Sequence, residues 1–140
     1  MAEPFVERVA EMSRQVGLGE VAVGEEEVRI TVPREPRAIR VTVRACGEMH
    51  GKEVLEFSSD GLALPADDAN KMPLLILALQ RNADVIFGHW GLDEDDAGST
   101  LRVFHSQITE TMDPPELRGA VLAVADEYAT LAGAFEELFR

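Results

Sequence analysis

The most regular stretch of the chain, residues 113–139, reads DPPELRGAVLAVADEYATLAGAFEELF. Its large apolar residues recur at spacings of four and three, which is the repeat of one face of an α-helix. They are Leu117, Val121, Val124, Tyr128, Leu131, Phe135 and Leu138. Asp113 stands at a capping position, Pro114 follows at the first helical position, and Glu116 completes a capping box. We therefore predict one long helix from Asp113 to Phe139.

Two further helices are expected upstream. Apolar residues at helical spacing begin at Phe5 and end at Val16, before Gly17. A middle helix follows Pro65, with Asp67, Asp68 or Asn70 as its cap, Pro73 in its first turn and Asn82 near its end. The interior of this middle helix, Leu74–Leu79, is apolar on every side, so more than one surface must cover it.

Between these helices the apolar period changes to two, which predicts half-buried strands. Three such strands contain Val28–Val32, Ile39–Ala45 and Glu53–Phe57, and residues 21–23 are a candidate short lead-in. Pro33 and Pro36 separate the first two.

Residues 84–90 and 100–108 are expected to form a hairpin around an acidic turn. The element order is then α-β-β-β-α-β-β-α, which indicates a single α+β domain over residues 1–140 with a five-stranded, largely antiparallel sheet packed by helices.

Charge is the unusual feature of the composition. Thirteen basic residues against 26 acidic ones give a formal net charge of −13, which disfavours direct binding to nucleic acid or to anionic membranes. One cysteine excludes an internal disulfide and suits a reducing compartment. The sequence has neither a membrane-spanning apolar stretch nor a signal peptide, so we expect a cytoplasmic protein.

The sequence carries no recognised catalytic, cofactor-binding or metal-binding motif, and we predict a protein that is not an enzyme and needs no cofactor. The acidic run Asp93–Asp96 lacks the ligand pattern of an EF-hand and is interpreted as a solvated turn. His89 and His105 are interpreted as an ordinary cross-strand pair, and Cys46 as a small packing residue. The alternative is a small enzyme, or a divalent-metal-dependent binder of small molecules, that uses the Asp and His residues.

Arg40 and Arg44 fall on the same face of the second expected strand, opposite its apolar residues. Cross-strand pairing with acids such as Glu26 or Glu53 is the preferred interpretation, ahead of a ligand site.

The apolar surface of the expected helices exceeds what one sheet covers. The last helix is about 39 Å long at 1.5 Å per residue, whereas a nine-residue strand spans about 30 Å. Its C-terminal end should therefore overhang the sheet. We predict a homodimer, with contacts from Leu74, Leu75, Ile76, Leu79, Phe135, Leu138 and Phe139.

The element order, the acidity and the middle helix resemble the YbjN-like family, within the type III secretion chaperone-like fold. The residues that carry the resemblance are LLILALQRN at 74–82, VIF at 85–87, the acidic turn, LRVF at 101–104 and the capped helix from Asp113. The resemblance implies a homodimeric, non-enzymatic module that holds a protein client, with Phe5, Val9 and Met12 as client-binding residues and a role in stress responses or regulation.

A negatively charged dimer would attract a basic client, such as a nucleic-acid-binding protein. The remaining alternative is a purely structural subunit of a larger assembly.

Overall fold

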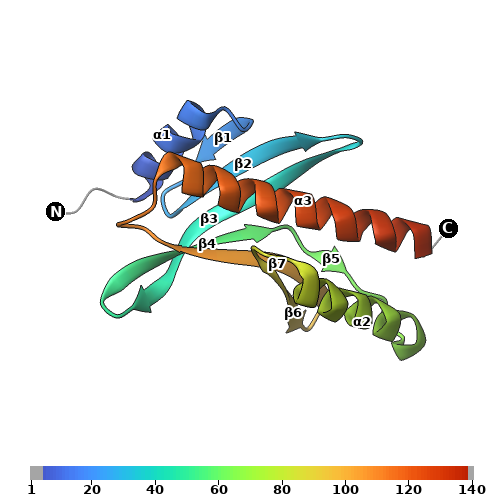
Figure 1. Ribbon diagram of the computed structural model, residues 1–140. Coiled ribbons are helices and arrows are strands. Elements are labelled where there is room, and N and C mark those ends of the chain that lie inside the picture. The colour runs from blue at the N-terminus through green and yellow to red at the C-terminus, as the bar shows by residue number, and fades with distance from the viewer. Residues whose placement is uncertain (1–4, 139–140) are drawn as a thin grey trace.

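The computed structural model, which describes residues 5–138, contains a single antiparallel sheet with three helices (Figure 1). Along the chain the elements are α1 (Phe5–Val16), β1 (Glu20–Val23), β2 (Glu27–Arg34), β3 (Arg37–Met49), β4 (Lys52–Ser59), β5 (Leu62–Ala63), α2 (Asp68–Asp84), β6 (His89–Asp95), β7 (Gly98–Ile108) and α3 (Pro114–Leu138). The predicted α+β class and the three helices are confirmed.

The sheet has seven strands rather than the predicted five. Its order is β1-β2-β3-β4-β7-β5. Strand β6 also pairs with β7, along the edge of β7 that β4 and β5 leave free. The two additional strands are β1 and β5, which have four and two residues. β1 contains residues 21–23, the candidate lead-in, whereas β5 is too short to show an alternating pattern and depends on its pairing with β7.

Long alternating strands account for the sheet core. Val28, Ile30 and Val32 of β2 are buried, as are Ile39, Val41 and Val43 of β3. Direct pairing of Val28 with Val43 and of Ile30 with Val41 places both sets on one face. Since side chains alternate along a strand, Arg40 and Arg44 of β3 lie on the opposite face.

Helices α1 and α3 lie across one face of the sheet, while α2 lies to one side near β6 (Figure 1). The apolar stripe of α3 is buried as predicted, with Leu117, Val121, Val124 and Leu131 wholly inaccessible to solvent. The bounds of α1 and α3 confirm the predicted ends within the described residues.

The predicted capping box of α3 is present. The Glu116 amide donates to Asp113 Oδ1 at 2.8 Å, and the Asp113 amide donates to Glu116 Oε1 at 3.3 Å. These two bonds satisfy donors that the first turn of a helix otherwise leaves unpaired.

Two predicted positions are wrong. Asp67, one of the three predicted caps, does cap α2, but Pro73 then lies in the interior of the helix and not in its first turn. Residues 84–88 are not a strand either: α2 continues to Asp84, a loop follows, and β6 begins only at His89. The apolar residues 85–87 imitate a strand in sequence, but the loop leaves Ile86 and Phe87 exposed instead of pairing them.

The end of α3 overhangs the sheet less than predicted. Phe135 is buried and Arg37 at the start of β3 forms an ion pair with Glu136, so the β2–β3 hairpin supports the last turns. Leu138 remains exposed, and Phe139 lies outside the described residues.

Replacing the α3 cap tests how much this helix end contributes. Asp113→Ala should lower the free energy of unfolding by about 1 kcal/mol, because the Glu116 amide loses its acceptor. Asp113→Asn keeps an acceptor and should remain near wild type in urea denaturation. Equal losses in the two variants would show that charge, and not capping, accounts for the effect.

Candidate interaction surfaces

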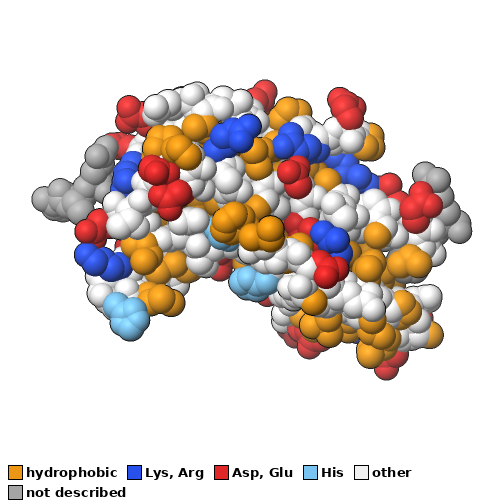
Figure 2. Space-filling model, viewed as in Figure 1, with side chains coloured by type: hydrophobic (Ala, Val, Ile, Leu, Met, Phe, Trp, Pro, Cys, Tyr) orange, Lys and Arg blue, Asp and Glu red, His pale blue; other side chains and the backbone are white. Residues whose placement is uncertain are grey.

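An apolar strip on the outer side of α2 is the largest exposed hydrophobic feature of that helix. Met72, Ile76 and Leu79 lie at spacings of four and three, and are 50%, 50% and 68% exposed. We call these three residues the α2 stripe. Ile86 and Phe87 continue the exposed apolar surface into the next loop. Figure 2 shows hydrophobic side chains gathered over α2.

The opposite side of α2 faces the protein. Leu74 and Ala78 are buried there, and they are the only buried residues of this helix. Arg81 follows Ala78 by three positions and therefore projects from the same side. The helix that the sequence describes as apolar on every side thus has one face covered and one face open.

A buried polar cluster joins α2 and β6 to α3. Arg81 donates to Glu127 through Nε at 2.8 Å and Nη2 at 2.7 Å, and the Trp90 indole donates to the same carboxylate at 3.0 Å. Glu127 is only 6% exposed although it is charged. The side chain of Asn82 also pairs with both the amide and the carbonyl of Trp90.

The environment of Glu127 acts on its pKa in two directions. Burial raises the pKa, while the hydrogen bonds from Arg81 and Trp90 and the charge of Arg81 lower it. The lowering prevails, so the pKa of Glu127 lies below its ordinary value and the group is ionised at neutral pH. Three hydrogen bonds to one carboxylate compensate its removal from water.

The sequence contains a signal for this cluster that the helical pattern alone did not identify. Glu127 follows Val124 by three positions and precedes Leu131 by four, which places an acidic residue within the apolar repeat of α3. Its cation and its indole partner come from other elements, so only the fold identifies Arg81 and Trp90 as the partners.

The predicted dimer contacts divide into two groups by exposure. Ile76, Leu79 and Leu138 are exposed and Leu75 is half-buried, whereas Leu74 and Phe135 are packed inside the chain. Leu74 and Phe135 therefore offer little surface to a partner. Phe139, the last of the predicted contacts, lies outside the described residues.

The predicted client-binding residues are also largely buried. Val9 is fully inaccessible and Met12 is 7% exposed, because this side of α1 packs into the hydrophobic core. Phe5 alone of the three is partly exposed. The apolar repeat of α1 is therefore a core signal for Val9 and Met12.

Phe5 lines a groove of about 590 Å³ between the start of α1, the β1–β2 turn and β3. We call it the acidic groove, and its lining residues are Phe5, Gly24, Glu25, Glu26, Glu27, Arg44 and Ala45. Glu25 and Glu26 are exposed at its rim, while Glu27 forms an ion pair with Arg29. The groove thus combines an aromatic side chain with two carboxylates open to solvent.

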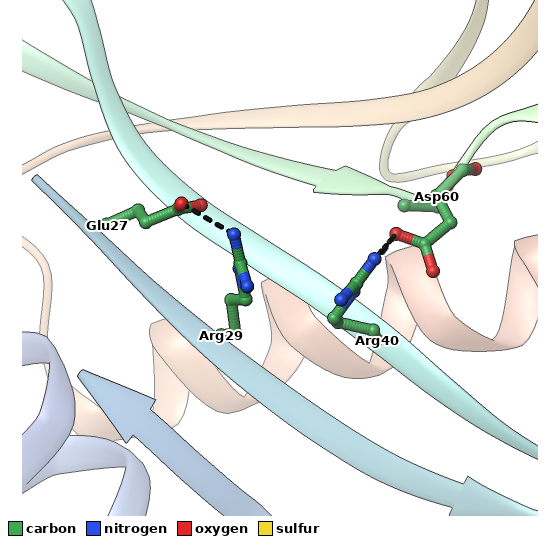
Figure 3. A network of polar contacts seen from close by, with 5 residues as sticks. Glu27, Arg29, Arg40 and Asp60 are labelled. Atoms are coloured by element: carbon green, nitrogen blue, oxygen red, sulfur yellow. Dashed lines mark hydrogen bonds and ion pairs between the residues drawn. The ribbon is translucent and has the colours of Figure 1, made fainter. Parts of the chain in front are cut away.

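The arginines of the outer sheet face are paired with carboxylates, as the sequence predicts, but with different partners. Arg40 bonds Asp60 at 3.0 Å and Arg44 approaches Glu56 to 3.8 Å. Figure 3 shows the Arg40–Asp60 pair beside the Arg29–Glu27 pair. The pairing of each arginine makes this face nearly neutral.

The two histidines of the β6–β7 hairpin are not a direct cross-strand pair. His89 lies opposite Phe104, one position away from His105. The His105 ring instead packs against Phe87 in an edge-to-face arrangement, with the ring centroids 5.3 Å apart. His105 Nε2 lies 3.0 Å from Gln107 Nε2. Burial and the nearby His89 lower the pKa of His105, which favours the neutral ring.

The predicted hairpin is present, but most of the acidic run belongs to its first strand: Asp93, Glu94 and Asp95 pair with β7, and only Asp96 lies in the turn. Asp95 Oδ1 accepts from the amides of Ala97 and Gly98, which is a local turn bond. Across residues 5–138, no group of three or more His, Cys, Asp or Glu side chains is arranged to hold a metal ion. Within the same residues, no helix is long and apolar enough to span a bilayer.

Cys46 is exposed, not packed as predicted. It lies at the register shift between Ala45 and Gly47, where the strand pairing of β3 with β4 slips by one residue. Desolvation and the neighbouring Glu56 raise the pKa of its thiol.

Comparison with known proteins places the fold. No protein-family model matches the chain, and no curated protein matches its sequence. Several solved structures are similar in architecture, including the following two. YbjN from E. coli, a candidate transcription regulator, aligns with a TM-score of 0.65 and 12% identity over 89% of this chain and 86% of that one. A chain of the HopA1–SchA chaperone–effector complex aligns with a TM-score of 0.58 and 19% identity over 94% of each chain.

These two likenesses confirm the predicted resemblance at the level of fold. The chain has a YbjN-like, chaperone-like fold.

Acidification tests the buried cluster. A carboxyl whose folded pKa is lowered contributes stability that is complete above its unfolded pKa, about 4.3, and that is lost as pH falls through the folded value. Trp90 is the only tryptophan, so its emission should stay constant from pH 7 to about pH 5 and shift to the red in stronger acid.

The neighbouring Asp126 supplies the control. It is exposed and pairs with Arg34 away from the cluster, so Asp126→Asn should titrate as wild type. Glu127→Gln should already be red-shifted at pH 7. Emission that stays unchanged until the whole chain unfolds in acid would contradict a separate role for Glu127.

Proposed function

We propose that this chain is a non-enzymatic, homodimeric protein-binding module that acts as a chaperone-like protein or regulatory adaptor. The observation that carries the proposal is the α2 stripe, an apolar helix face on which Met72, Ile76 and Leu79 are each at least half exposed. Contiguous apolar surface of this kind marks interaction sites in monomeric folds. A stress-related regulatory role is the setting implied by the YbjN-like resemblance.

A second copy of the chain is the proposed partner of the α2 stripe. In a two-fold dimer the same surface serves both subunits, so Ile76 and Leu79 of each would pack against the other. Fully burying one such side chain contributes about 1.5–3 kcal/mol. Half-buried Leu75 lies beside the stripe and would extend the contact.

The acidic groove is the proposed client site. Phe5 supplies apolar contact, and Glu25 and Glu26 supply charge for a basic segment. The net charge of −13 adds long-range attraction, which raises the association rate with a basic protein at low salt. A nucleic-acid-binding protein has the required chemistry, and the likeness to a chain of a chaperone–effector complex supports a protein as the client.

Sedimentation velocity tests the dimer. Wild type should sediment as a dimer at tens of micromolar, and Ile76→Glu/Leu79→Glu should sediment as a monomer, because two carboxylates per subunit would be buried in the apolar contact. Met49→Glu is the matched control, since Met49 is 59% exposed on the β3–β4 hairpin, away from α2. A wild-type monomer, or a dimer that persists in the double variant, would contradict the proposed interface.

Peptide binding tests the client site. A fluorescein-labelled peptide of alternating lysine and leucine should bind wild type, and the same peptide with glutamate in place of lysine should not. Glu25→Lys/Glu26→Lys should weaken the first interaction about tenfold at low salt, and added salt should weaken wild-type binding as well.

Charge reversal elsewhere provides the control for the peptide experiment. Asp95→Lys/Asp96→Lys changes the net charge by the same amount but lies at the β6–β7 turn, so it should affect binding less than the groove variant. Equal losses in the two variants would indicate attraction to the whole chain, without a site in the groove.

A further inference from the structure

The apolar residues of α2 do not determine which of its sides faces the protein. Leu74–Leu79 presents an apolar side chain in every direction. Turning the helix by one residue, about 100°, would bring Leu75 and Leu79 inward in place of Leu74 and Ala78. Because hydrophobic burial is non-directional, the rotated helix would bury a similar apolar area.

Arg81 is the residue that breaks this equivalence. It projects from the same side as Leu74 and Ala78, seven and three positions away. Its guanidinium contacts both oxygens of Glu127, at 2.8 and 2.7 Å. A two-point contact of this kind fixes orientation as well as distance, because the planar fork must face the carboxylate.

The neighbouring contacts reinforce the same setting. The Trp90 indole holds Glu127 from β6 at 3.0 Å, and Asn82 pairs with the backbone of Trp90 at 2.6 and 3.2 Å. A rotation of α2 by one residue would break the contacts of both Arg81 and Asn82. It would also leave Glu127, which is 6% exposed, as a buried carboxylate without its cation, which is strongly unfavourable.

We infer that Arg81 and Glu127 set the rotation of α2 about its axis and so determine which residues form the α2 stripe. They are positioning residues, since neither belongs to the stripe itself. This inference goes beyond the proposed function. It rests on the proposed function only in taking the α2 stripe to be a contact surface for a second copy. Without the pair, α2 would populate rotated settings in which Ala78 becomes accessible and part of the stripe turns inward.

Thiol labelling of a single cysteine at position 78 tests the inference. Cys46→Ser removes the native thiol, and Ala78→Cys then places a small side chain at a site that is 3% exposed. Labelling by a maleimide should be slow with the cluster intact. In Arg81→Met/Glu127→Gln it should be at least tenfold faster, while far-UV circular dichroism stays unchanged. Glutamine keeps an acceptor for the Trp90 indole, and methionine keeps most of the arginine stem.

Two controls separate rotation of α2 from unfolding. Ala10→Cys, on α1 and 2% exposed, should stay protected in the same double variant. Asp126→Asn should leave Ala78→Cys protected. If Ala10→Cys is labelled as well, the double variant has unfolded. The labelling rates of Ala78→Cys and Ala10→Cys are then compared in Arg81→Lys instead, because this variant keeps the positive charge and loses the two-point contact.

The inference is overturned if Ala78→Cys remains protected while Ala10→Cys shows that the fold is intact. It is also overturned if Arg81→Lys labels as slowly as the intact cluster. The labelling experiment reports on α2 in a monomer as well as in a dimer. A wild-type chain that sediments as a monomer would therefore contradict the proposed function without affecting this result.

Discussion

The packing of α3 across the sheet is the interaction on which the other elements depend. Its apolar face fills the space above β2, β3, β4 and β7, and α1 packs against the same helix. Arg34 and Arg37 then tie the β2–β3 hairpin to Asp126 and Glu136 of α3 by exposed ion pairs. Exposed pairs add little free energy, so burial of the apolar face supplies most of the stabilisation.

The attachment of α2 follows a different physical rule. This helix buries only Leu74 and Ala78, and its position relies on an ion pair between the partly exposed Arg81 and the buried Glu127. Burying a charge is costly, and a hydrophobic replacement of a buried pair is often as stable. What the pair provides is direction, which apolar contacts lack. The orientation of the open α2 stripe therefore depends on polar geometry, and the fold itself on apolar burial.

Charge is distributed unevenly over the molecule. Arginines of the outer sheet face are neutralised by nearby acids, so the excess of carboxylates lies elsewhere, on loops, turns and helix surfaces. At the acidic groove, Glu25 and Glu26 combine this charge with an aromatic side chain. A basic segment would meet both features together, whereas the neutral sheet face would attract ions of neither sign over a distance.

The sequence by itself determined the three helices, the capping box of α3 and the strands β2, β3 and β4, because each depends on contacts within a few residues or on a long regular period. Only the tertiary structure decided the short strand β5, the burial of Val9 and Met12, and the partners of Glu127 and His105. These depend on elements far apart in the chain: Arg81 and Glu127 are 46 positions apart, and no local pattern links them. The sequence of α2 does not show which face of the helix is buried, because the helix is apolar on every side. The distant carboxylate of Glu127 selects that face.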